Sequence, residues 1–469
     1  MRPRSRLATL CFLFVWSSFA FAVDDQNQKL DRQFQSAVAQ YDAGKFAAAA
    51  AELENLLPYA PKSFEIHELL ALAYAAQAQD SKAIQHFQIA VQLKPDSAEA
   101  HTNLGASLSH LGKTEEAGKQ FRKALALEPA DYDTNHNLGE FYIQSNKISE
   151  GTTYLEAAQR INPAAYDNGY DLATAYLLTG RPDRSREVVQ SLLRQKDTGE
   201  LHNLLGQIDE KDGKYLDAVN EFQTAAHMDP SEDNLFHWGS ELLLHRTYEP
   251  AIEVFQRGTE LYPKSPRLFI GLGMALYSRG KYDDAVKALL AASDLDPSDP
   301  RCYYFLSKAY DSSPTQAEEV IQRFQRFCKF QPANGRAYYY YAMSLWKGRR
   351  AEEPDVDLQQ VKFLLEKSVT LDPNLAEAHL QLGNLYSEQH DYAKAGPEYE
   401  RALQLNADLA DAHYRLGQVF VHTGQKDRAQ QEFDVYQRLR AQHMAELDKE
   451  RAEVQQFVYT AKAAPAAKP

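Results

Sequence analysis

The sequence contains little cysteine, and only its N-terminus carries a long apolar run. Three cysteines occur in 469 residues, and Cys11 lies inside that run. After residue 22 no stretch stays apolar over the roughly 20 residues that a membrane-spanning helix needs, so we expect no later membrane span. Positive charge is also scarce, because 51 Lys and Arg face 65 Asp and Glu, which gives a net charge of −14. This balance disfavours nucleic acid as a partner, since nucleic-acid binding calls for a basic face.

Sequence motifs of catalysis and metal binding are also missing. The chain contains no G-x-x-x-x-G-K, G-x-S-x-G, H-E-x-x-H or C-x-x-C, the spacings that place phosphate-binding, nucleophilic or metal-ligating groups together. We therefore expect no catalytic residues, no metal and no cofactor.

The first 22 residues have the pattern of a secretory signal peptide. Three arginines precede an apolar run over residues 7–22 that ends in Ala-Phe-Ala. A basic start, an apolar middle and a small-x-small end are typical of a cleaved leader. We expect cleavage after Ala22 and a periplasmic or secreted mature protein, with an uncleaved anchor helix as the alternative.

The remainder of the chain is built from one repeated unit. Prolines recur every 34 residues at Pro61, Pro95, Pro129 and Pro163, and the series resumes at Pro230 with spacings of 33 to 41 residues. In the unit Ala98–Pro129, small residues stand at the eighth and twentieth positions, Gly105 and Ala117. Antiparallel helices cross closely only where neither carries a bulky side chain, and proline ends a helix. Each unit is therefore expected to be a pair of antiparallel helices.

The same positions recur in twelve units. Their first residues are Leu30, Phe64, Ala98, Tyr132, Tyr166, Gly199, Glu232, Pro266, Pro300, Gly335, Ala376 and Ala410. Turns between the paired helices are expected at Gly44, Gly112, Gly180, Gly213, Gly280 and Gly424. The tenth unit carries an insertion over residues 347–357, which is either a contact site or a tolerated surface loop.

This pattern resembles the tetratricopeptide repeat, whose period is 34 residues. The resemblance implies an all-α fold, an α-solenoid in which helix–turn–helix units form a right-handed superhelix. It organises the chain into a signal peptide (1–22), a short N-terminal segment (23–29), a solenoid of twelve repeats (30–443), a long C-terminal capping helix (444–462) and a disordered tail (463–469). The capping helix is expected because a solenoid end must be covered.

Two groups of residues have both a structural and a functional interpretation. Five histidines occupy the fourth position of a repeat, where the family usually has tryptophan, and we interpret them as packing residues and not as metal ligands: His67, His101, His202, His379 and His413. Cys302 and Cys328 lie near the start of one helix and the end of its partner. They are either a candidate disulfide or two separately buried thiols.

Repeats eight to ten differ from the others on the face that lines the concave groove in this family, formed by positions 2, 5, 9, 12 and 13 of each first helix. Position 2 is acidic elsewhere, which suits a helix N-terminus, but it is arginine in these three repeats. Arginine and aromatic residues are enriched at interface hot spots. The predicted partner-binding residues are Arg267, Arg301, Arg336, Tyr304, Tyr339, Tyr277, Met274, Trp346, Lys308 and Phe236.

These residues predict a non-enzymatic scaffold of the bacterial envelope that binds acidic, partly apolar segments of other proteins. The structural alternative is that the tyrosines pack between helices and the arginines pair with nearby acids. The functional alternative is a polysaccharide-binding or export accessory protein, in which the aromatic side chains stack on sugar rings.

Overall fold

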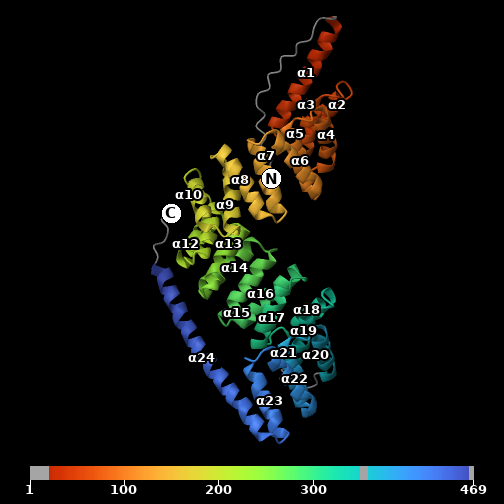
Figure 1. Cartoon of the computed structure of the whole chain (residues 1–469). Helices are drawn as coiled ribbons and strands as arrows, with labels where there is room; N and C mark the ends of the chain where they lie inside the picture. Colours follow the sequence, from red (N-terminus) through yellow and green to blue (C-terminus); the bar gives the residue numbers. More distant parts are fainter. Residues whose placement is uncertain (1–20, 349–356, 464–469) are drawn as a thin grey trace. The chain divides into compact units, whose positions relative to one another are not determined.

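The computed structural model describes residues 21–348 and 357–463, with side chains described for residues 28–347 and 357–445. All regular secondary structure in these ranges is helical. The helices form two compact units, one ending at Asp197 and the other beginning at Thr198 (Figure 1). The predicted signal peptide lies almost entirely outside the described residues, as do most of the repeat-ten insertion and the C-terminal tail.

The first unit contains ten helices in its described part, which are α1 (Phe21–Asp42), α2 (Phe46–Leu56), α3 (Phe64–Ala75), α4 (Asp80–Leu93), α5 (Ala98–His110), α6 (Thr114–Leu127), α7 (Tyr132–Gln144), α8 (Ile148–Ile161), α9 (Tyr166–Leu178) and α10 (Pro182–Leu193). Consecutive helices pack against one another throughout this unit. Helix α1 begins at Phe21, so residues 23–29 extend the first helix of repeat one.

The second unit continues the pattern over its described residues with α11 (Gly199–Lys211), α12 (Tyr215–Met228), α13 (Glu232–Leu244), α14 (Tyr248–Leu261), α15 (Pro266–Ser278), α16 (Tyr282–Leu295), α17 (Pro300–Ser312), α18 (Ala317–Phe330), α19 (Gly335–Gly348), α20 (Leu358–Leu371), α21 (Ala376–Glu388), α22 (Tyr392–Leu405), α23 (Ala410–His422) and α24 (Lys426–Ala463). Eleven of the twelve predicted repeat starts coincide with the first residue of a helix.

The small residues lie where paired helices cross. A Cβ atom added to Gly151 would lie 2.7 Å from the carbonyl oxygen of Gly139. These are the twentieth and eighth positions of repeat four, so α7 and α8 approach backbone to backbone. The six predicted turn glycines all have positive φ, between 71° and 84°. Glycine adopts this left-handed conformation without the steric cost that a side chain adds.

Helices α17 and α18 pack less closely than the two helices of any other repeat. The link between them contains Pro314 and ends at Gln316, which has a left-handed backbone. The candidate disulfide is not formed: Cys302 and Cys328 are both buried free thiols. The Cys302 Sγ atom instead lies 3.1 Å from the carbonyl oxygen of Asp299. The loose pairing of the two helices explains why the second interpretation, two separately buried thiols, is correct.

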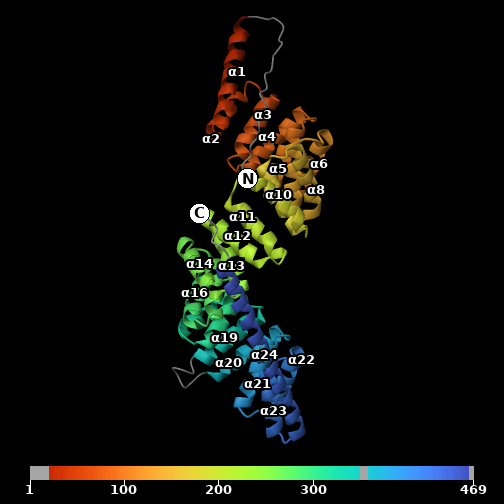
Figure 2. The same ribbon diagram turned by 90° about the vertical axis from the view of Figure 1, so that its left-hand side faces the viewer.

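Helix α24 is the longest helix and starts as the second helix of repeat twelve (Figure 2). It packs against α23 through its first turns, where Ala429 is buried. The predicted capping helix over 444–462 is the continuation of this helix, not a separate element. Met444, which was expected to cover the apolar end, is 50% exposed. Across the described part of the chain, none of the helices combines the length and apolarity needed to cross a bilayer.

Candidate functional site

The predicted groove arginines do not form one patch, because the second unit places two of them around a shared hollow. This hollow has a volume of about 270 Å³ and lies between α17 and α19. Arg301 and Arg336 flank it. Its wall is mainly aromatic and is formed by Tyr304, Phe305, Phe327 and Tyr340, with Pro300 and Asn334. We call it the arginine–tyrosine hollow.

The Arg301 guanidinium group is held at the edge of this hollow by the N-cap of its own helix. Asp299 caps α17 by accepting a hydrogen bond from the Arg301 backbone N–H. The same carboxylate accepts hydrogen bonds from Arg301 Nε at 3.0 Å and from a terminal nitrogen at 2.7 Å. These bonds lower the pKa of the Asp299 carboxyl group. The Arg301 side chain nevertheless remains 69% exposed, so one face of the guanidinium is accessible.

Arg336 and Tyr304 are the other exposed groups of the hollow. The Arg336 backbone N–H donates a hydrogen bond to Asn334 Oδ1 at 3.0 Å, which caps the start of α19. Tyr304 is 40% exposed, and the Lys308 Nζ atom lies 5.9 Å from its ring centroid. Burial raises the pKa of the neighbouring Tyr340 to about 12, an effect that Arg336 opposes. The hollow therefore combines buried aromatic walls with cationic side chains at its rim.

Arg267 is engaged one repeat earlier. Its Nε atom donates to Glu232 at 2.6 Å, and a terminal nitrogen donates to Asp233 at 2.6 Å. The guanidinium also lies 5.1 Å from the Phe236 ring centroid. For this arginine the structure has the alternative arrangement, pairing with acids of the adjacent repeat.

The remaining predicted groove residues are only partly accessible. Met274 and Tyr277 are partly buried against the core, and the Tyr277 ring contacts Tyr282 at 5.6 Å. Tyr339 is also partly buried, with its ring 5.7 Å from that of Tyr340. Burial raises the pKa of the Tyr339 hydroxyl. These side chains shape the groove floor and contribute less exposed surface than Tyr304.

A larger hollow lies on repeats ten to twelve, beyond the repeats that the sequence singles out. It measures about 330 Å³ and is lined by residues of α19, α21 and α23 together with Tyr392. From the predicted set it includes Trp346, which is buried, and the adjacent Lys347, whose Nζ atom pairs with Asp311 at 2.7 Å. Its other lining side chains are mostly polar, including Gln381, Asn384, Arg415, Gln418 and His422. We call it the polar hollow.

Family models described as tetratricopeptide or TPR repeats match residues 34–98, 98–131, 132–164, 152–208, 273–311, 364–396 and 386–449. These matches span both units and more than half of the chain. The chain belongs to the tetratricopeptide repeat (TPR) family. Proteins of this family generally act as protein–protein interaction scaffolds and are typically not enzymes.

Similarity to individual TPR proteins is partial. TPR repeat-containing protein YpiA of Bacillus subtilis is 26% identical over 191 residues, which are 40% of this chain and 43% of YpiA. Small glutamine-rich tetratricopeptide repeat-containing protein 2 of Mycosarcoma maydis is 29% identical over 20% of this chain and 27% of its own length. The chain therefore spans less than half of the curated relatives that it matches.

Solved TPR structures are similar to parts of the chain. The structure of pilF from Pseudomonas aeruginosa aligns with 18% identity and a TM-score of 0.40, over 45% of this chain and 96% of that one. The structure of PilW, described as a type IV pilus biogenesis factor, aligns with 23% identity and a TM-score of 0.41, over 44% and 97%.

The fourth-position histidines of these TPR units are structural residues. His101 is buried, its Nε2 atom lies 3.1 Å from the carbonyl oxygen of Pro95, and its Nδ1 atom lies 2.6 Å from Gln120. His379 repeats the arrangement with Pro373 and Glu398. The ring therefore connects the second helix of its own repeat to the proline that closes the previous one, so it supplies hydrogen bonds as well as packing.

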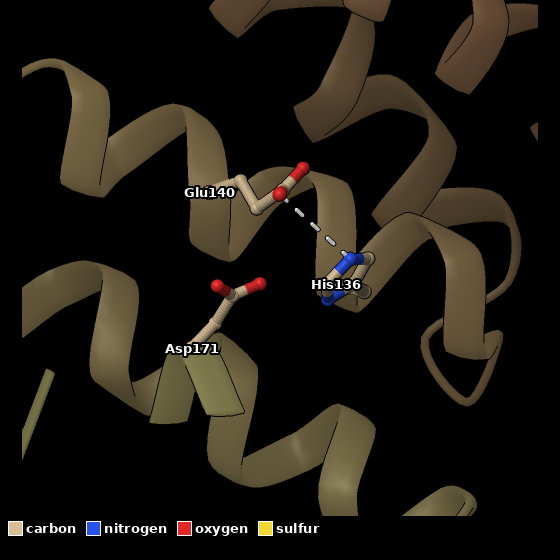
Figure 3. A group of neighbouring side chains, drawn as sticks. All are labelled: His136, Glu140 and Asp171. Atoms are coloured by element: carbon tan, nitrogen blue, oxygen red, sulfur yellow. Dashed lines mark ion pairs between the residues drawn. The ribbon is translucent and has the colours of Figure 1, made fainter. Parts of the chain in front are cut away.

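A group in the first unit was missed by the sequence analysis. His136 and Glu140 lie one turn apart on α7, and Asp171 lies on α9 (Figure 3). One ligand-type atom from each lies within 4.8 Å of the others. Burial and the neighbouring Glu140 raise the pKa of Asp171 to about 6. The available signal was His-x-x-x-Glu at positions 5 and 9 of repeat four, but the third residue is 31 positions further along the chain.

Proposed function

We propose that this TPR protein is an exported scaffold that binds acidic, partly apolar segments of other proteins at the arginine–tyrosine hollow. The observation that carries the proposal is the placement of two arginines around one aromatic hollow. Arg301 and Arg336 offer bidentate donors to carboxylates, and the aromatic walls offer apolar surface to a neighbouring side chain. Scaffold function in the wider family agrees with this reading.

Export is the second component of the proposal. It is supported by the leader pattern in residues 1–22 and places the scaffold in the periplasm or outside the cell. N-terminal sequencing of the protein from fractionated cells tests it. A chain beginning at Val23 in the periplasmic or secreted fraction supports export, and a chain beginning at Met1 in the cytoplasm contradicts it.

Binding is tested with peptides that combine Asp or Glu with Phe or Leu, and with matched peptides in which Lys replaces the acids. The full chain should prefer the acidic peptides, with an affinity that falls as salt increases. The double variant Arg301→Glu/Arg336→Glu should lose this preference. Arg438→Glu/Arg440→Glu, which reverses two exposed charges on α24, is the matched control and should bind normally.

The outcome that contradicts the proposal is equal binding of acidic and basic peptides, or acidic-peptide binding that survives charge reversal at the hollow. The same variants test the polysaccharide alternative, which is favoured by the exposed Tyr304 ring beside two arginines. Salt-sensitive retention on an acidic polysaccharide, lost in Arg301→Glu/Arg336→Glu and in Tyr304→Ala, would favour a sugar ligand.

A further inference from the structure

The group formed by His136, Glu140 and Asp171 has the composition of a metal site. His136 and Glu140 are four residues apart on α7, so they lie on the same helix face. Asp171 approaches from α9, the first helix of the next repeat, and Figure 3 shows all three side chains turned toward one space. The nitrogen and the two carboxylate oxygens lie within 4.8 Å of one another.

The orientation of the His136 ring is set by a buried amide. Its Nδ1 atom lies 3.1 Å from Asn168 Oδ1. Asn168 is fully buried, and its own amide nitrogen donates to the Leu155 carbonyl oxygen at 3.0 Å and to Gln159 at 2.7 Å. Because the Asn168 oxygen is thereby the acceptor, Nδ1 of His136 carries the hydrogen. In the neutral ring, Nε2 then holds the lone pair.

That lone pair is directed at the carboxylates. Nε2 lies 3.9 Å from Glu140 Oε1, which is too long for a hydrogen bond. The Tyr132 ring stacks on the imidazole at 5.7 Å and 7° and helps to fix its plane. A metal-binding histidine has the same arrangement, with one nitrogen held by an outer hydrogen-bond acceptor and the other presented to the ion.

The local charge balance also favours a cation. Asp171 forms no hydrogen bond or ion pair with any other described residue. Asp133 and Asp167, at the starts of the same two helices, add to the negative field around Tyr132. Two carboxylates therefore face one imidazole with further acids nearby, and a divalent ion would offset this repulsion.

We propose that His136, Glu140 and Asp171 bind one divalent transition-metal ion, with Zn²⁺ favoured by the donor set. Zinc takes imidazole nitrogen at about 2.0 Å and carboxylate oxygen at about 2.0–2.2 Å, so the three side chains close slightly around it. Mg²⁺ and Ca²⁺ prefer all-oxygen sites. Three protein ligands leave a coordination position for water or for a donor from a bound partner. The site belongs to the first unit, so it is independent of the proposed peptide site.

Calorimetric titration of the full chain, prepared without a polyhistidine tag and stripped with EDTA, tests the proposal. ZnCl₂ should bind saturably with one high-affinity site per chain, and Co²⁺ should give the visible absorption of a low-coordinate nitrogen–oxygen site. Asp171→Asn and Glu140→Gln preserve side-chain size and should each weaken Zn²⁺ binding at least tenfold. His443→Ala removes an exposed imidazole on α24 and should leave binding unchanged.

Circular dichroism in EDTA establishes that each variant is folded, so a loss of binding reports on the ligands. The proposal is overturned if the chain shows no saturable zinc binding. It is also overturned if Asp171→Asn and Glu140→Gln bind zinc as tightly as His443→Ala, or if Mg²⁺ competes equally with Zn²⁺ at the same concentration.

Discussion

The hydroxyl group of Tyr303 donates a hydrogen bond to the backbone carbonyl oxygen of Pro297, 3.1 Å away. Tyr303 occupies the fourth position of repeat nine, and Pro297 closes repeat eight. The same link is made by different side chains in other repeats, such as the Asn135 amide with Pro129 at 3.0 Å. This position therefore provides the hydrogen bond that attaches one repeat to the next, whether the residue is histidine, tyrosine or asparagine.

Replacing Tyr303 with Phe should destabilise the second unit by about 1–2 kcal/mol, since it leaves the Pro297 carbonyl without this donor. The ring itself is retained, including its stacking on Phe327 at 4.0 Å. The midpoint of urea unfolding measures the effect. Tyr304→Phe is the control, because that hydroxyl belongs to an exposed side chain. Equal midpoints for the two variants would show that the Pro297 bond contributes nothing.

Gly151→Ala should destabilise the first unit by about 1–3 kcal/mol, the usual cost of overpacking. The new methyl group would meet the Gly139 carbonyl oxygen at 2.7 Å, and backbone atoms cannot move aside easily. Gly118→Ala is the matched control on α6. Its nearest atoms, at 3.3 Å, are the ends of the Arg122 and Phe141 side chains, which can shift. Thermal unfolding should therefore place the Gly118 variant near the wild type, and a similar loss in both variants would refute the explanation.

The buried Glu68 should make stability fall as pH rises. Burial raises its pKa to about 7, and one carboxylate oxygen lacks a hydrogen-bond partner, while the other accepts from Asn103 at 2.7 Å. Between pH 4.5 and 7 the folded state binds more protons than the unfolded state, so the free energy of unfolding decreases across this window. The full loss, reached above pH 7, is about 2–3 kcal/mol.

Glu68→Gln removes this titration and should be more stable than the wild type at pH 8 but not at pH 4.5. Urea unfolding of both proteins at several pH values measures the difference. Glu187→Gln changes an exposed carboxylate on α10 and should leave the pH profile unaltered. Parallel profiles for the wild type and Glu68→Gln would rule out the effect.

The two cysteines of the repeats should be unreactive in the folded protein. Burial raises the pKa of both the Cys302 and Cys328 thiols to about 12, so neither forms the thiolate that reacts with Ellman's reagent. Unfolding in the absence of reductant should release two thiols from a chain that begins at Val23, and a third, Cys11, if the leader is retained. The absence of reactive thiols after unfolding would instead indicate a disulfide.

The sequence alone determined the repeated helix pairs of this protein. Short-range rules operate in each unit: small residues at the crossing, glycine at the turn and proline at the close. Together they predicted eleven helix starts to the residue. The one start that differs, α1 at Phe21 in place of Leu30, belongs to the first repeat, which has no preceding closing proline to mark its beginning.

Only the tertiary structure decided which side chains share a site. Arg267, Arg301 and Arg336 occupy equivalent positions, yet the last two flank one hollow while Arg267 pairs with Glu232 and Asp233. Asp171 likewise reaches His136 only because α9 packs beside α7. Such contacts depend on the distance and rotation between neighbouring helices and on the competing acids nearby. A repeat pattern read along the chain contains neither quantity, because it describes each helix in its own frame.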